Sequence, residues 1–194
     1  MTKTGLLFGS FNPIHIGHLA LANYLLEYSS FDDLWFIVSP QNPFKDEKDL
    51  TLPHHRLEMT RLATREEPRF FACDVEFHLP RPSYTIHTLR KLSGYYPSHN
   101  FSLIIGSDNL HTIGRWAESK EILDHYPLAV YPRPGFPVNK NTPRPSKNTI
   151  FFDPPLLDIS STFIREGIMQ GKQLRFLVPA GVYDYIISHK LYQT

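Results

Sequence analysis

The sequence predicts an α/β fold in which a doubly wound, mainly parallel sheet of five to six strands carries helices on both faces. Two observations lead to this prediction. Short apolar runs alternate along the chain with longer segments rich in helix-forming residues, a pattern typical of parallel strands joined by covering helices. The chain of 194 residues, 41% of them hydrophobic, is also long enough to fill the core of one large domain.

The first strand is expected at Thr4–Phe8, because this run is too short and too apolar for a surface helix. Five later runs have the same character, and we expect them to complete the sheet: Leu34–Ser39, Arg69–Phe77, Phe101–Gly106, Leu128–Tyr131 and Thr149–Phe152.

The segments that separate or follow these runs are expected to be helical: Ile16–Tyr28, His54–Glu66, Tyr84–Leu92, Ala117–His125, Ser161–Gln170 and Val182–Leu191. Pro53 suits the start of the second helix, and Gly94 suits the end of the third. Residues 132–145 contain five prolines and are predicted to form a loop, because strand-like sequence follows them at once. We therefore expect residues 1–194 to form a single Rossmann-like domain, with a C-terminal helical part from about residue 159.

The composition excludes several classes of protein. Twenty basic and 19 acidic residues give a net charge of +1, which argues against a nucleic-acid or membrane-surface protein. No apolar segment reaches the roughly 20 residues that a membrane helix needs. Cys73 stands alone, so no intramolecular disulfide is possible, and the cytoplasm is the expected compartment. A homo-oligomer is compatible with the sequence, which does not specify one.

The most informative segment is residues 9–18, which read Gly-Ser-Phe-Asn-Pro-Ile-His-Ile-Gly-His and which we call the histidine loop. It lies between the first strand and the first helix. Gly9 lets a ligand approach the backbone, Pro13 fixes the turn, and the helix directs its free N–H groups and positive dipole outward. His15 and His18 share one face of that helix. These features favour a phosphate site, whereas a zinc site would need further ligands that are not nearby.

Polar clusters also follow other predicted strands. Residues 41–45 follow the second, and Gly106–Asn109 follow the fourth. Ligands of parallel sheets bind at the carboxyl ends of the strands, so we expect these loops to converge there. The glycine pattern of dinucleotide oxidoreductases is absent from the sequence, and Gly167–Lys172 is one residue short of a P-loop and lies at a helix end. These two classes of protein are therefore not supported.

A second motif, residues 159–165, reads Ile-Ser-Ser-Thr-Phe-Ile-Arg. Alone it is typical of an ordinary helix cap followed by an exposed arginine. Together with the histidine loop, it offers a second helix N-terminus and an arginine that can bind two phosphate oxygens at once.

The histidine loop and the second motif together resemble the nucleotidyltransferase superfamily, whose members join ATP or CTP to a phosphorylated acceptor. Within it, the chain is most similar to the bacterial nicotinate-nucleotide adenylyltransferases. The similarity extends over nearly the whole chain: Pro40–Lys45, His55–Met59, Ser83–Leu89, Ile105–Asp108, Trp116, Leu177–Pro179, Tyr185–Ile186 and Leu191–Tyr192. Two residues depart from the family pattern: His87 stands where an aspartate is usual, and Phe44 where a histidine is frequent.

The resemblance implies adenylyl transfer from ATP to nicotinate mononucleotide, giving nicotinate adenine dinucleotide and pyrophosphate in NAD biosynthesis. It also implies Mg²⁺ held mainly by the ATP phosphates and water. The attacking phosphate is already an anion, so no Ser, Cys or general base has to be activated. Catalysis would then consist mostly of positioning and of neutralising charge.

The resemblance also implies a role for individual residues. His18 would stabilise the α-phosphate with His15 beside it, and Lys45 would reach in as a point charge. Arg165 and Ser161 would hold the β- and γ-phosphates. The remaining ATP-binding residues would be Gly9, Ser10, Phe11, Gly106 and Asp108, the last two at the ribose. Nicotinate mononucleotide would be bound by Tyr84, Thr85, Trp116 and Lys45, with no metal ligand supplied by the chain.

Two other functions remain open at this point. The same chemistry could act on nicotinamide mononucleotide or phosphopantetheine, or could transfer a cytidylyl group. A non-catalytic nucleotide sensor is a different class, but a sensor predicts a damaged set of phosphate-binding residues, and His15, His18, Lys45, Ser161 and Arg165 are all present. Pyrophosphate release with each acceptor would discriminate among these readings.

Overall fold

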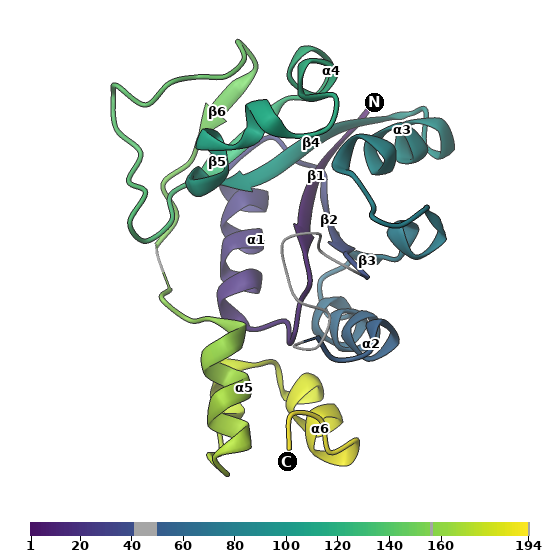
Figure 1. Ribbon diagram of the computed structural model, residues 1–194, viewed down its shortest axis with the longest axis vertical. Helices are drawn as coiled ribbons and strands as arrows, with labels where there is room; N and C mark the ends of the chain where they lie inside the picture. The colour runs from purple at the N-terminus through teal and green to yellow at the C-terminus, as the bar shows by residue number, and fades with distance from the viewer. Residues whose placement is uncertain (41–49, 156, 194) are drawn as a thin grey trace.

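The computed structural model describes residues 1–40, 50–155 and 157–193. Within this part of the chain, six strands form one sheet in the order β3-β2-β1-β4-β5-β6 (Figure 1). Every pairing is parallel. The bounds are β1 Thr2–Gly9, β2 Asp33–Val38, β3 Phe70–Cys73, β4 His99–Gly106, β5 Leu128–Tyr131 and β6 Thr149–Phe151. The predicted doubly wound parallel sheet is confirmed.

The described helices cover both faces of the sheet. Their bounds are α1 Ile16–Tyr28, α2 Pro53–Thr64, α3 Thr85–Tyr95, α4 Ser119–His125, α5 Ser161–Met169 and α6 Ala180–Ser188. Buried side chains of α1, α2, α5 and α6 belong to one apolar cluster. Those of α3 and α4 belong to a second cluster. The chain changes face between β1 and β4, which are neighbours in the sheet, so this is the expected place for a ligand crevice.

Several predicted boundaries are wrong by a few residues. The strand expected to run to Phe77 ends at Cys73, and a 3₁₀ helix, η2, follows at Val75–His78. There the chain turns, with the Phe77 N–H donating to the Asp74 carbonyl over 2.9 Å, and so leaves the sheet. Gly94 does not end the third helix, because α3 continues to Tyr95.

The two helices that were predicted around residues 117–125 and 182–191 also begin differently. Glu118 has a φ of 50°, a left-handed conformation that no helix interior accommodates, so α4 begins only at Ser119. The last helix begins directly after Pro179, at Ala180, and ends at Ser188. Short 3₁₀ helices occupy Ser107–His111 (η3), Ile113–Arg115 (η4) and Arg175–Leu177 (η5).

Helices α5 and α6 lie beyond the carboxyl end of β1, at the lower end of the molecule in Figure 1. Their apolar side chains Ile164 and Val182 are fully buried in the cluster that also holds Leu25 of α1. This packing fixes the start of α5 beside the loop that follows β1.

Candidate active site

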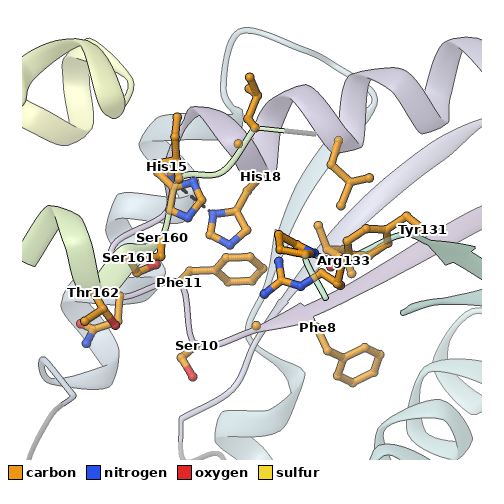
Figure 2. A pocket seen from close by; sticks show the side chains of 18 of the residues that line it. Phe8, Ser10, Phe11, His15, His18, Tyr131, Arg133, Ser160, Ser161 and Thr162 are labelled. Carbon is orange, nitrogen blue, oxygen red and sulfur yellow. Dashed lines mark hydrogen bonds between the residues drawn. The ribbon is translucent and has the colours of Figure 1, made fainter. Parts of the chain in front are cut away.

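A cavity of about 690 Å³ lies at the carboxyl ends of β1 and β5, between the first residues of α1 and α5 (Figure 2). Most of the ATP-binding residues expected from the sequence line it: Gly9, Ser10, Phe11, His15, His18, Asp108, Ser161 and Arg165. The two sequence motifs, separated by some 150 residues of chain, therefore share one cavity.

The histidine loop fixes the ring of His18 through a backbone contact. His15 precedes α1 with extended backbone angles, and its N–H donates to Nδ1 of His18 over 3.2 Å. A ring nitrogen that accepts a hydrogen bond carries no proton, so the neutral imidazole of His18 carries its hydrogen on Nε2. The ring of Phe11 lies edge-on to His18, with 5.2 Å between centroids. His18 is therefore held as a hydrogen-bond donor of defined direction.

His15, which lies next to His18, is electrically neutral at pH 7. Its ring lies 3.8 Å from that of His18 between centroids, and only 5% of the residue is exposed. Burial lowers the pKa of His15 to about 4, with the positive charge of Arg133 adding to the effect. Its Nδ1 is buried and has no hydrogen-bond partner among the described residues. An anion in the cavity would raise the pKa of His15 again.

The second motif contacts the histidine loop directly. Arg165 donates from Nη1 to the backbone oxygen of Asn12 over 3.0 Å, and Ser161 donates from Oγ to that of Pro13 over 2.9 Å. Ser160 caps α5, its Oγ accepting the N–H of Phe163 over 3.1 Å. The N-terminus of α5 is thereby held at the cavity, next to that of α1.

Arg133 follows β5 and lines the cavity, and it was not predicted from the sequence. Figure 2 shows its side chain pointing toward Phe11 and His18. A Cβ at Gly106 would clash with Asp108 and would lie 2.7 Å from Cγ of Arg133, so glycine is needed there for both side chains to approach. A basic residue at the carboxyl end of a predicted strand was the signal that could have revealed Arg133.

The residues expected to bind the acceptor lie elsewhere on the same edge of the sheet. Tyr84, Thr85, Trp116 and also Gly106 are not among the described residues that line the cavity. Tyr84 immediately precedes α3 and is 43% exposed. Trp116 is partly buried against the second apolar cluster, so it also serves in packing. Lys45 and Phe44 lie outside the described residues.

The described residues offer few metal ligands. No group of three or more His, Cys, Asp or Glu side chains among them is arranged to hold a metal ion. Asp108 is the one carboxylate in the described part of the cavity lining. Nor is any of the described helices long and apolar enough to cross a membrane.

Comparison with known proteins gives consistent matches. Residues 6–167 match the family model described as cytidylyltransferase-like. A protein of Bacteroides fragilis (strain YCH46), named as a probable nicotinate-nucleotide adenylyltransferase, is 53% identical over 187 residues, 96% of this chain and 92% of that protein. A Porphyromonas gingivalis protein of the same name is 48% identical, covering 97% of this chain and 95% of its own length.

The fold also matches a solved structure. The nicotinic acid mononucleotide adenylyltransferase of Plasmodium falciparum, complexed with NaAD, superimposes with a TM-score of 0.83. The match covers 99% of this chain and 98% of that chain at 20% identity, so it bears on the fold alone.

Proposed function

Because the chain belongs to the cytidylyltransferase-like family and, within it, to the nicotinate-nucleotide adenylyltransferases, we propose that its cavity transfers an adenylyl group from ATP to nicotinate mononucleotide. The products are nicotinate adenine dinucleotide and pyrophosphate, and the reaction is a step of NAD biosynthesis. The observation that carries the proposal is the contact between Arg165 and the Asn12 carbonyl, which joins two phosphate-binding motifs at one cavity.

The main obstacle to this reaction is repulsion between two polyanions. The N-termini of α1 and α5 both reach the cavity, and each supplies free N–H groups and the positive end of a dipole. Arg133 and Arg165 add two full positive charges to the lining. We assign Arg165 and Ser161 to the β- and γ-phosphates. We assign Arg133 to the negative phosphate charge that lies near His15 and His18.

In the transfer step, a 5′-phosphate oxygen of nicotinate mononucleotide attacks the α-phosphorus. The bond from that phosphorus to the bridging oxygen breaks, and pyrophosphate leaves with the electron pair. No proton has to be removed from the nucleophile. The Nε2–H of His18 donates to a non-bridging oxygen of the α-phosphate as charge develops there, and its fixed orientation needs no rearrangement during the reaction. His15, Lys45 and Arg165 complete the catalytic set.

We assign the rest of the ATP molecule to the start of the histidine loop and to the loop after β4. Gly9, Ser10 and Phe11 contact the nucleotide, and Gly106 and Asp108 hold the ribose, since a carboxylate accepts hydrogen bonds from both hydroxyls. For the acceptor, the backbone of Tyr84 and Thr85 at the start of α3 donates to the nicotinate carboxylate. Trp116 stacks on the pyridine ring, and we assign Lys45 to the acceptor on the resemblance alone.

The donor set of the cavity fits a Mg²⁺ ion that arrives with the nucleotide. Asp108 is the one carboxylate in the described lining, whereas a metal held by protein alone would need more oxygen ligands. When bound to the phosphates and water, Mg²⁺ neutralises part of the triphosphate charge. The chain's own task is to orient the phosphates that carry it.

Reaction of the purified protein with a panel of substrates tests the proposal. ATP or CTP is combined with nicotinate mononucleotide, nicotinamide mononucleotide or phosphopantetheine, and pyrophosphate and the dinucleotide are measured. We expect the highest kcat/KM for ATP with nicotinate mononucleotide. Faster turnover with another pair would replace the proposed substrate, and binding of ATP without pyrophosphate release would favour a sensor.

We further propose that the protein works in the cytoplasm, on ATP and nicotinate mononucleotide, without nucleic acid or membrane partners. The near-neutral net charge and the single, unpaired Cys73 support this assignment.

A further inference from the structure

Glu76, a residue that the proposed mechanism does not use, is a buried carboxylate in η2. Only 2% of the residue is exposed. Its described partners are three hydroxyl groups, not a cation: Ser39 donates to Oε2 over 2.6 Å, Ser83 to Oε2 over 3.1 Å, and Thr88 to Oε1 over 2.8 Å. Burying a carboxylate is costly, and an apolar side chain would fill the same space more cheaply. This environment needs a reason beyond packing.

The three hydroxyls belong to three different parts of the carboxyl edge of the sheet. Ser39 directly follows β2. Ser83 immediately precedes Tyr84 and Thr85, and we call Ser83–Thr85 the acceptor segment. Thr88 lies in the first turn of α3. An ionised carboxylate accepts all three hydrogen bonds at once, so Glu76 fixes the acceptor segment and the start of α3 against the end of β2.

Ser39 is tied on its other side to the histidine loop. Its carbonyl accepts from Nη1 of Arg56 over 2.6 Å, and the same nitrogen donates to the carbonyl of Ser10 over 2.7 Å. Arg56 is fully buried, and its other donors reach the carbonyls of Pro40 and Thr51. Burial lowers the pKa of Arg56 to about 10, which leaves it charged at neutral pH.

A continuous path of hydrogen bonds therefore runs from Ser10, which lines the cavity, through Arg56, Ser39 and Glu76 to Ser83. Arg56 and Glu76, two buried side chains of opposite charge, therefore lie on either side of Ser39. Arg56 donates to backbone carbonyls, and Glu76 accepts from three hydroxyls. Such a path gives the histidine loop and the acceptor segment a defined spacing that apolar packing would not specify.

We propose that Glu76 is a positioning residue for the reaction, which holds the acceptor segment in register with the histidine loop so that the bound acceptor meets the α-phosphate. The inference rests on the proposed function, which assigns Tyr84 and Thr85 to nicotinate mononucleotide. The physical reason is alignment, because an in-line attack loses rate steeply when the reacting groups are misplaced by about 1 Å.

The first test is Glu76→Gln, which keeps the shape of the side chain and removes its charge. We expect kcat/KM for nicotinate mononucleotide to fall about tenfold or more, the size of one lost hydrogen bond to a charged group, while KM for ATP changes less than twofold. The melting temperature should stay level or rise, because burial raises the pKa of Glu76, so that ionised Glu76 is a cost to the fold at neutral pH.

Substitutions at Ser39 and Thr88 test the path itself. Ser39→Ala removes the hydroxyl that donates to Glu76 and leaves the carbonyl that accepts from Arg56. It should therefore lower kcat/KM for nicotinate mononucleotide in the same way as Glu76→Gln. The double variant with Glu76→Gln should be no worse than the more impaired single variant. Thr88→Val should also lower kcat/KM for nicotinate mononucleotide. Thr88→Ser keeps the hydroxyl and should have the kinetic constants of the wild type. If Glu76→Gln does not fold, Ser39→Ala decides by the same criteria.

Glu67→Gln is the matched control, because Glu67 pairs with Arg69 in the turn before β3, at the opposite edge of the sheet. It should leave the constants for both substrates unchanged. An unchanged kcat/KM for nicotinate mononucleotide in Glu76→Gln would overturn the proposal. So would an equal rise in KM for ATP and for nicotinate mononucleotide together with a lower melting temperature, since that indicates a structural role only.

Hydrogen exchange separates this proposal from the proposed function. Amide exchange in residues 83–88 should be faster in Glu76→Gln than in the wild type, and unchanged in Glu67→Gln. This comparison needs no turnover. If the wild type fails to use nicotinate mononucleotide, the proposed function fails, and the exchange rates still decide whether Glu76 holds the segment; equal rates in both variants would reject it.

Discussion

The two histidines of the same loop differ in what their surroundings allow. His18 accepts a backbone hydrogen bond at Nδ1, which fixes its tautomer, whereas His15 is buried and kept neutral. In the proposed function, His18 donates to the charge that develops on the α-phosphate, and the ring of His15 contacts that of His18.

Substituting His18 by alanine should separate catalysis from folding. We expect kcat to fall by about 10² to 10³, the usual effect of removing one preorganised donor. The melting temperature should change little, since the ring lies at a cavity and not in an apolar cluster. Steady-state assays and thermal unfolding measure the two quantities, and wild-type turnover in the variant would reject the role of His18.

His15 should make the fold sensitive to acid. Its pKa is about 4 in the folded state against 6.5 in the unfolded chain, so the unfolded state binds the extra proton between these values. The free energy of unfolding should therefore decrease by about 3 kcal/mol as the pH falls from about 6.5 to 4.

Urea unfolding at several pH values checks this prediction, with His15→Gln as the control that lacks the titrating group. The free energy of unfolding should decrease less on acidification in His15→Gln than in the wild type. Identical pH profiles for the two proteins would contradict the assignment. Saturating ATP should also reduce the loss in the wild type, since anionic phosphates favour protonated His15.

At the scale of elements, the start of α5 carries both a structural cap and a proposed phosphate site. Ser160 caps the helix, and Ser161 begins it. These two roles respond differently to negative charge, because a carboxylate is a good cap but repels phosphate.

Ser160→Ala should lower the free energy of unfolding by about 1 kcal/mol through loss of the cap, and Ser160→Asp should retain it. For ATP the order is reversed: KM should rise much more in Ser160→Asp than in Ser160→Ala, because a negative charge is added beside the triphosphate. Urea unfolding and steady-state kinetics provide the comparison. An unchanged KM for ATP in Ser160→Asp would place the phosphates away from α5.

The elements that could be predicted from the sequence are those with a strong local pattern. The helix at residues 16–28 and the strand at 128–131 coincide with prediction, as does the order of strands and helices. The end of β3 could not be predicted, because Val75 and Phe77 continue an alternating pattern typical of a strand, whereas the chain turns locally after Cys73 and Glu76 is held by distant segments. Glu76 illustrates this: the hydroxyls that bury it come from positions 39, 83 and 88.

For the site, too, residues in motifs with a strong local pattern could be predicted, and others could not. Residues in the two motifs could be found because a helix N-terminus after a strand has a recognisable composition, and the structure brings His15, His18, Ser161 and Arg165 to one cavity. Arg133 belongs to neither motif and was missed, although its place directly after a predicted strand was a usable signal. The roles of Lys45, Tyr84, Thr85 and Trp116 rest on the resemblance and stay predictions.

At the scale of the whole molecule, we propose that residues 1–194 form one domain, including the C-terminal helices. Helix α6 packs on α2, and near the end of the chain the hydroxyl of Tyr192 donates to Oδ1 of Asn12 over 2.9 Å. Burial raises the pKa of Tyr192 to about 12, so this donor keeps its hydrogen at neutral pH.

One domain should unfold in one step. We expect the fluorescence of Trp35, buried in β2, and the circular dichroism of the helices to follow a single urea transition with the same midpoint. Trp116→Phe removes the second tryptophan, so that the signal reports the sheet alone. Two separate midpoints would indicate that α5 and α6 form an independent unit.

The contacts of Ser161 and Arg165 with the carbonyls of Pro13 and Asn12 have a consequence for the time at which this protein becomes competent. A ribosome makes residues 9–18 early and residues 161–165 late. For most of its synthesis the growing chain therefore lacks the partners of these two carbonyls. Under the proposed function, it then carries only one of its two phosphate-binding motifs, so we expect no ATP to be consumed before residues 161–165 have emerged.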